Sequence, residues 1–147
     1  MRVNVTGVFV CAREGARHMV KRRTGSIVNI ASVNGVRAVT TMAAYCASKA
    51  AVISLTQTLA CELAPLGVRV NAILPAQVET PMIAEQVGIE RTRREERIPL
   101  GRYGRPEEIA AAACFLSSNE ASFITGHQLA LDGGYLAFGF RPAVASL

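Results

Sequence analysis

Apolar positions in the first 64 residues change from helical to strand-like spacing and back again. Residues 2 to about 22 carry apolar side chains on a helical repeat, and the basic residues 21–23 suit the end of a helix. Residues 26–32, SIVNIAS, are typical of a short strand that is buried on both faces. A polar loop is expected over residues 33–41, and a long helix from about residue 41 to residue 64. The apolar stripe of that helix consists of Val52, Leu55, Leu59 and Leu63.

The second half of the chain continues the alternation of strands and helices. Residues 68–75, VRVNAILP, predict a second strand that ends at its proline. Residues 76–104 are less regular, with one helix expected around 81–96. A further helix is predicted over 105–118, because a proline near its first turn and two glutamates after it are favourable at a helix start. Residues 126–134, GHQLALDGG, predict a third strand followed by a turn.

This order of elements predicts an α/β fold in which helices cover a parallel sheet. About three strands are few for an open parallel sheet. The first helix starts at residue 2 with no strand before it, so the strand that it should cover is missing from the sequence. We therefore expect residues 1–147 to form a single domain that is the second half of a larger one.

Amino-acid composition indicates what kind of core and which cellular compartment to expect. Half of the residues are apolar, but only 5% are aromatic and there is no Trp, so we expect a core of Ala, Val, Ile and Leu. No apolar run approaches the roughly 18 residues of a membrane span, and charged residues interrupt the N-terminus too early for a signal peptide. The cysteines form no CxxC pair and stand among small or apolar residues, as buried thiols do. A reduced, cytoplasmic setting is expected for Cys11, Cys46, Cys61 and Cys114.

The net charge of +5 does not identify a nucleic-acid-binding protein. The densest basic segments are residues 21–23 and 91–97, and the second contains glutamates and resembles a solvated face of mixed charge. Neither segment has the interleaved aromatic residues of a nucleic-acid surface. The two histidines, His18 and His127, have no partner at the spacing of metal ligands, so no metal site is expected.

The most informative pair of residues is Tyr45 and Lys49, which are four positions apart on the predicted long helix and therefore share a face. At about 4 Å and an effective dielectric constant near 20, an ammonium attracts a phenolate by about 4 kcal/mol. A phenol stabilised in this way can exchange a proton with a substrate oxygen at neutral pH. The pair alone is weak evidence, because a surface Tyr beside a Lys is ordinary.

Two polar residues strengthen the hypothesis of an active site. Ser32 ends the first predicted strand, 13 residues before Tyr45, at the edge where parallel sheets form ligand crevices. Its hydroxyl could bond to the same substrate oxygen. Asn4 lies on the first helix, 28 residues before Ser32. Two other asparagines are less informative: Asn34 is expected to be a turn residue, with a substrate contact as the alternative, and Asn71 is expected to be structural.

These residues belong to an ordered set of motifs that resembles the short-chain dehydrogenase/reductase family. The likeness covers nearly the whole chain, from Arg2 to about Tyr135. The motifs are NVTGVF, GSIVNIASVNG, YCASK, VRVNAILPAQVETPM, GRPEEIA, FLSS and ITGHQLALDGG. The sequence looks closest to 3-oxoacyl-(acyl-carrier-protein) reductase-like members and to polyol or sugar dehydrogenase-like members. The resemblance implies the C-terminal half of a doubly wound, Rossmann-type parallel sheet.

The family resemblance implies an NAD(P)-dependent oxidoreductase that interconverts an alcohol and a ketone by hydride transfer. It assigns Tyr45 as the general acid and base, and Lys49 as the residue that assists Tyr45 and holds the ribose of the nicotinamide. It assigns Ser32 to the substrate carbonyl and Asn4 to a water that links Lys49 to solvent. The partner implied is a small-molecule alcohol or ketone, within a homo-oligomer.

The resemblance also implies a cofactor site for NAD or NADP, with no preference between them. The residues that it assigns to this site are Tyr45, Lys49, Pro75, Ala76, Val78 and Thr80. Ala76 replaces the usual glycine, which would cost about 1–2 kcal/mol if the position needs a positive φ. Thr80 has a second interpretation as a helix N-cap before Pro81. Residues 83–100 match the variable substrate loop of the family.

The sequence lacks the glycine-rich turn between the first strand and helix that holds the cofactor pyrophosphate in the family. The chain is therefore expected to be an N-terminally truncated domain. This leaves an alternative function: an inactive fragment, or a non-catalytic partner that joins full-length subunits. The small-residue face of the long helix could pack on its own sheet or on a second subunit. This face consists of Ala43, Ala47, Ala50, Ala51 and Ser54.

Overall fold

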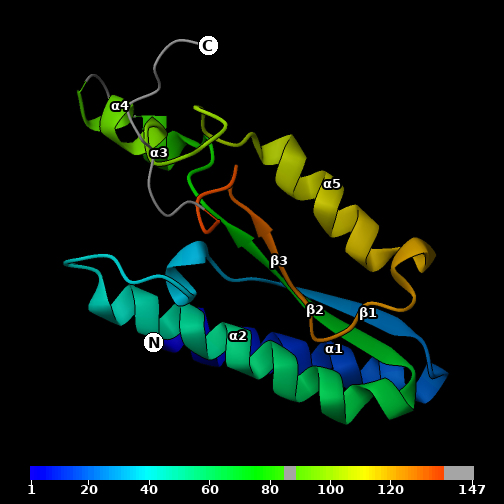
Figure 1. The fold of residues 1–147 in the computed structure, drawn as a ribbon. Helices are drawn as coiled ribbons and strands as arrows, with labels where there is room; N and C mark the ends of the chain where they lie inside the picture. Colours follow the sequence, from blue (N-terminus) through cyan, green and yellow to red (C-terminus); the bar gives the residue numbers. More distant parts are fainter. Residues whose placement is uncertain (85–88, 138–147) are drawn as a thin grey trace.

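A three-stranded parallel sheet forms the centre of the protein in a computed structural model, which describes residues 1–84 and 89–137 (Figure 1). The strands are β1 (Gly25–Ile30), β2 (Val68–Pro75) and β3 (Gln128–Leu131), and β2 lies between the other two. Pairing runs from Gly25↔Val68 at the start of β1 to Pro75↔Leu131 at the end of β2. The predicted α/β class with about three parallel strands is therefore confirmed.

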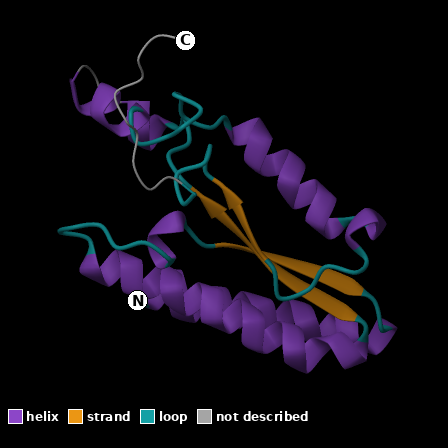
Figure 2. Ribbon diagram, viewed as in Figure 1, coloured by secondary structure: helices purple, strands orange, loops and turns teal. Residues whose placement is uncertain are grey.

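Helices cover both faces of this sheet, as expected for a doubly wound arrangement (Figure 2). Helices α1 (Val8–Arg22) and α2 (Ala43–Leu63) pack side by side on one face, and α5 (Pro106–Ser117) packs on the other. A π-helical turn, Arg2–Gly7, leads into α1. The predicted first helix is therefore helical from residue 2, but its first six residues are wound more loosely than an α-helix.

The core lies around β2, which is buried along almost its whole length because helices cover both of its faces. The expectation of a purely aliphatic core was incomplete. Tyr103 and Tyr135, which follow α4 and β3, are both buried in the main core cluster beside Val52 and Leu74. Their rings fill volume that the few large aliphatic side chains of the chain leave open.

The region between β2 and α5 differs from the prediction. In place of one helix over residues 81–96, the structure has two short helices, α3 (Pro81–Ala84) and α4 (Ile89–Glu95), and residues 85–88 lie outside the described residues. The first strand was predicted to be buried on both faces, but β1 is an outer strand of the sheet and is mostly half-buried. The predicted loop 33–41 contains a 3-10 turn, Val33–Gly35. The third strand is short and is followed by a glycine turn, as predicted; Gly126 and Gly133, which have a positive φ, lie on either side of it.

The prediction of buried cysteines was wrong. Cys11, Cys61 and Cys114 are exposed, and Cys46 is half-buried; all four are free thiols. The prediction was based on the apolar neighbours of each cysteine in the sequence. Residues adjacent along a helix point to different faces, so an apolar neighbour can face the sheet while the cysteine faces solvent. A cytoplasmic location stays a prediction. Within the described ranges, no helix is long and apolar enough to cross a membrane.

Candidate active site

Helix α2 carries Tyr45 and Lys49 on one face, as predicted. The Lys49 Nζ atom lies 5.8 Å from the centroid of the Tyr45 ring. It also donates a hydrogen bond of 3.0 Å to the carbonyl of Ile30, the last residue of β1. The ammonium therefore connects α2 to the carboxyl end of the sheet, where the phenol of Tyr45 also stands.

Ser32 lies two residues beyond the end of β1, close to the carbonyl that Lys49 contacts. Its side chain is buried, and its Oγ accepts a hydrogen bond of 3.2 Å from the backbone N–H of Asn34. This bond caps the 3-10 turn Val33–Gly35, and it supports the prediction that Asn34 is a turn residue. Ser32, Tyr45 and Lys49 are thus placed by elements that meet at one edge of the sheet.

Gly35 lets this turn pack directly on α2. A Cβ atom at Gly35 would lie 2.8 Å from the carbonyl carbon of Lys49 and 2.9 Å from the backbone nitrogen of Ala50. Both atoms belong to the backbone of the helix and cannot rotate away. The turn that follows Ser32 is therefore held against the helix that carries Tyr45 and Lys49 by a contact only glycine permits.

Replacing Gly35 by Ala is expected to lower the free energy of unfolding by about 1–3 kcal/mol, because the turn or the helix must move to admit the methyl group. Urea denaturation followed by circular dichroism measures this change. Gly15→Ala is the matched control: its Cβ would meet nothing closer than 4.0 Å on α1, and alanine favours helix. If Gly35→Ala were as stable as the parent, the packing described for this turn would be wrong.

Asn4 lies on the π-helical turn before α1 and reaches α2 through a residue that the sequence analysis missed. Its Nδ2 donates to Ser48 Oγ at 3.2 Å, and Ser48 Oγ donates to the carbonyl of Tyr45 at 2.7 Å. Ser48 is only 1% exposed. Its position inside the YCASK motif, one residue before Lys49, was the available signal. The four predicted catalytic residues are thereby linked to one helix and one sheet edge.

Burial lowers the pKa of Lys49, because removal from water disfavours the charged form. The same loss of water strengthens the attraction between the ammonium and a nearby anion.

The segment that follows β2 starts at the same edge of the sheet, because β1 and β2 are parallel neighbours. Ala76 does not have a positive φ, and its backbone N–H donates to Leu131 at 3.2 Å. Its methyl packs against the main core cluster, so the departure from glycine causes no backbone strain. Val78 forms an isolated bridge with Gly104. The carbonyl of Thr80 accepts a bond of 2.9 Å from Ile83, as expected at a helix start.

Metal binding has no support in the described part of the chain. No group of three or more His, Cys, Asp or Glu residues there is arranged to hold an ion. His18 and His127 are both exposed.

Comparison with known proteins decides the family. Residues 1–136 match the family model described as enoyl-(acyl carrier protein) reductase. The chain belongs to the short-chain dehydrogenase/reductase family. The family of oxidoreductases that the motifs indicated is thus confirmed.

Curated relatives within this family differ in activity. The chain is 45% identical over 143 residues to "inactive 2-(S)-hydroxypropyl-CoM dehydrogenase 2" of Xanthobacter autotrophicus, covering 93% of this chain and 62% of that protein. It is 45% identical over 134 residues to a 3-oxoacyl-(acyl-carrier-protein) reductase of Thermotoga maritima, covering 91% and 54%. It is 47% identical over 139 residues to an NAD-dependent glycerol dehydrogenase of Listeria innocua, covering 92% and 54%. The chain therefore spans a little over half the length of these relatives.

Solved structures confirm the Rossmann-type fold. A gluconate 5-dehydrogenase of Burkholderia cenocepacia, in complex with NADP and tartrate, is 37% identical with a TM-score of 0.91. The match covers 95% of this chain and 55% of that one. A 3-oxoacyl-(acyl-carrier protein) reductase of Brucella melitensis is 39% identical with a TM-score of 0.86, over 90% of this chain and 50% of that one.

Proposed function

We propose that this chain carries the proton-transfer part of an NAD(P)-dependent oxidoreductase that interconverts an alcohol and a ketone. One observation carries the proposal: the Lys49 ammonium lies 5.8 Å from the Tyr45 ring centroid, at the sheet edge where β1 ends beside Ser32. The family and its NADP-bound gluconate 5-dehydrogenase structure support this interpretation.

In this proposal Tyr45 is the acid and base. Its hydroxyl donates a proton to the ketone oxygen during reduction, and its phenolate takes the proton back during oxidation of the alcohol. The Ser32 hydroxyl donates a hydrogen bond to the same oxygen. Lys49 stabilises the phenolate, and Asn4 holds a water that passes protons between Lys49 and solvent. The nicotinamide cofactor, when bound, supplies or accepts the hydride.

The residues present fit the nicotinamide half of such a cofactor. An ammonium has three N–H donors, and one of those on Lys49 bonds to Ile30, so donors remain for a ribose diol. Pro75, Ala76, Val78 and Thr80 are proposed to lie along the nicotinamide and pyrophosphate. The 147 residues contain no glycine-rich strand-to-helix turn of the kind that holds a pyrophosphate.

The test is an assay of the purified protein with NADH or NADPH and a set of small ketones, 3-oxoacyl thioesters and oxidised sugars. We expect the absorbance of the reduced nicotinamide to fall only when a carbonyl compound is added. The preferred cofactor and substrate class then follow from kcat/KM. Absence of turnover with every pair, in either direction, would contradict the proposal.

A second candidate function is that of a non-catalytic partner or an inactive fragment. Two observations favour it. A relative that is 45% identical is itself named inactive, and the small-residue face of α2 is mostly exposed, with Ala43, Ala47, Ala50 and Ser54 open to solvent. Such a face suits pairing with another subunit, which would also make a catalytic protein a homo-oligomer. No cofactor binding in a titration, together with a stable dimer in sedimentation, would favour this candidate.

A further inference from the structure

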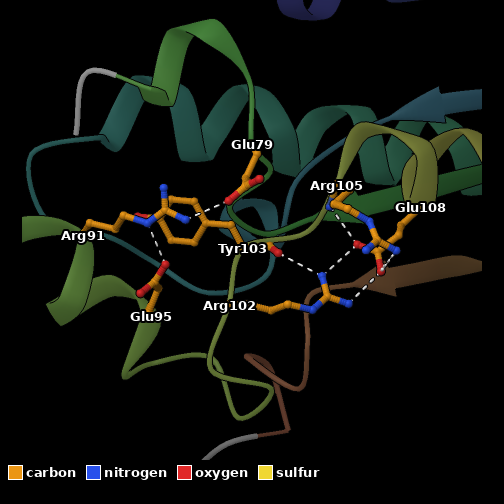
Figure 3. A network of polar contacts seen from close by, with 7 residues as sticks. All are labelled: Glu79, Arg91, Glu95, Arg102, Tyr103, Arg105 and Glu108. Carbon is orange, nitrogen blue, oxygen red and sulfur yellow. Dashed lines mark hydrogen bonds and ion pairs between the residues drawn. The ribbon is translucent and has the colours of Figure 1, made fainter. Parts of the chain in front are cut away.

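Arg91 of α4 lies where three segments of the chain meet, and its guanidinium contacts all three (Figure 3). Its Nη2 donates to Glu79 Oε1 at 2.7 Å, and Glu79 follows β2. Its Nε donates to Glu95 Oε1, also at 2.7 Å, one turn farther along α4. The guanidinium carbon lies 5.0 Å from the centroid of the Tyr103 ring. The prediction that residues 91–97 form a simple solvated face was therefore incomplete.

The two partners of Arg91 outside α4, Glu79 and Tyr103, lie on segments that are bonded to each other. The backbone N–H of Gly104 donates to Gln77 at 2.9 Å, and that of Glu79 donates to Gly104 at 2.8 Å. These bonds hold the residues around Glu79 beside the segment that contains Tyr103. The Tyr103 side chain is only 2% exposed, so its ring is fixed in the core.

The segment that contains Tyr103 is also anchored to α5. Arg102 donates to the carbonyl of Tyr103 at 2.9 Å and to both carboxylate oxygens of Glu108, at 2.7 and 3.0 Å. Glu108 also accepts the backbone N–H of Arg105 at 2.7 Å. The Arg102 side chain and this N–H lower the pKa of Glu108 to about 2, so its carboxylate stays charged at any ordinary pH. Backbone bonds and the core thus hold the segments of Tyr103 and Glu79 in place, and Arg91 joins α4 to both of them.

We propose that Arg91 is a positioning residue that sets where α4 lies relative to residues 75–80, and so shapes the substrate side of the site. This inference rests on the proposed function, in which Pro75, Ala76, Val78 and Thr80 lie along the cofactor, and on the family resemblance, which assigns the segment that contains α4 to the substrate loop. The planar guanidinium suits this role, because two of its five N–H groups engage two carboxylates at once while its flat face rests on a ring. Lysine offers no such fork.

The geometry argues against the alternative that Arg91 binds an anionic substrate. Glu79 and Glu95 already neutralise its charge and occupy its Nη2 and Nε donors. The Arg91 and Glu79 side chains are 42% and 49% exposed, so the ion pair is partly open to water and sensitive to salt. An anion at this guanidinium would meet the repulsion of two carboxylates that already lie beside it.

Amide hydrogen exchange of the cofactor-free protein tests the positioning role. Glu79→Gln and Arg91→Gln are each expected to reduce the protection of residues 89–95 and of residues 76–80 by about three- to tenfold. The double variant should lose no more than Arg91→Gln alone, because that substitution already removes the pair with Glu79. Arg91→Lys should recover only part of the loss. Salt near 1 M should lower protection more in the parent than in Glu79→Gln, which keeps only the ion pair of Arg91 with Glu95.

The control is Glu14→Gln, which breaks the exposed pairs of Glu14 with Arg13 and Arg17 on α1 and should leave α4 unchanged. Three results would each overturn the inference. They are unchanged protection in Glu79→Gln, additive losses of protection in the double variant, and no protection of α4 in the parent. A parent without turnover would contradict the proposed function, and the exchange result would still decide the inference. With turnover, Glu79→Gln should raise the KM of the carbonyl substrate several-fold and change kcat by less than about twofold. An unchanged KM would contradict the proposal that Arg91 shapes the substrate side of the site.

Discussion

Replacing Tyr45 by Phe is expected to lower kcat by about 100-fold or more while leaving the fold intact. The substitution removes only the hydroxyl that is proposed to exchange a proton with the substrate oxygen, and general acid–base catalysis of this kind contributes about 10²- to 10⁴-fold. The ring, which Lys49 approaches to 5.8 Å, is retained. Initial rates with saturating cofactor and substrate measure the effect, and urea denaturation verifies that stability is preserved.

Tyr135→Phe is the matched control, because it removes the same hydroxyl from a ring that is buried in the main core cluster. That variant should retain turnover. If Tyr45→Phe also retained turnover, Tyr45 could not be the acid and base, and another proton donor would have to be sought near Ser32.

Replacing Asn71 by Leu is expected to lower the free energy of unfolding by about 2–5 kcal/mol. Asn71 lies within β2 and is 0% exposed. Its Nδ2 donates to the carbonyl of Ile124 at 2.9 Å, and its Oδ1 accepts the backbone N–H of His127 at 3.0 Å. Leucine has a similar volume but would remove both bonds. The His127 N–H would lose its partner, the Ile124 carbonyl would keep only a 3.3 Å bond from Arg69, and an unsatisfied buried group costs about 1–3 kcal/mol. The loss would be a large part of the roughly 5–15 kcal/mol that stabilises most domains.

Gln57→Leu provides the comparison for Asn71→Leu, because it makes the same kind of change on the exposed surface of α2. It should alter stability by less than about 0.5 kcal/mol. The free energy of unfolding of both variants is measured by urea denaturation, with one common dependence of that free energy on urea concentration. An Asn71→Leu variant as stable as Gln57→Leu would mean that the link from β2 to residues 124–127 does not hold the sheet together.

Local patterns in the sequence predicted the elements well. The apolar stripe on residues 41–64 placed α2 to within two residues, because a long helix on a sheet repeats its buried positions regularly. Residues 68–75 matched β2, since a central strand is apolar on both faces. The pairing of Tyr45 with Lys49 also followed from local spacing, because both lie on one helix.

Contacts between distant segments were the part that the sequence could not supply. Ser48 looks like an ordinary small helical residue until the turn that carries Asn4 is seen to rest on it. Arg91 belongs to a charged run whose partners, Glu79 and Tyr103, are each 12 residues away along the chain. The exposed cysteines were mispredicted for a related reason: burial depends on which face of a helix meets the sheet, and a list of sequence neighbours does not contain that information.

The parallel pairing of the three strands also determines when the candidate site can form. Gly25 pairs with Val68, 43 positions later, and Ala72 pairs with Gln128, 56 positions later. Joining segments so far apart costs chain entropy before any pairing is gained, and folds of this kind assemble slowly. The Lys49 ammonium reaches the carbonyl at the end of β1 only when α2 has packed on the sheet. The proposed site would thus be completed late as the chain folds, although Ser32 and Lys49 stand only 17 positions apart.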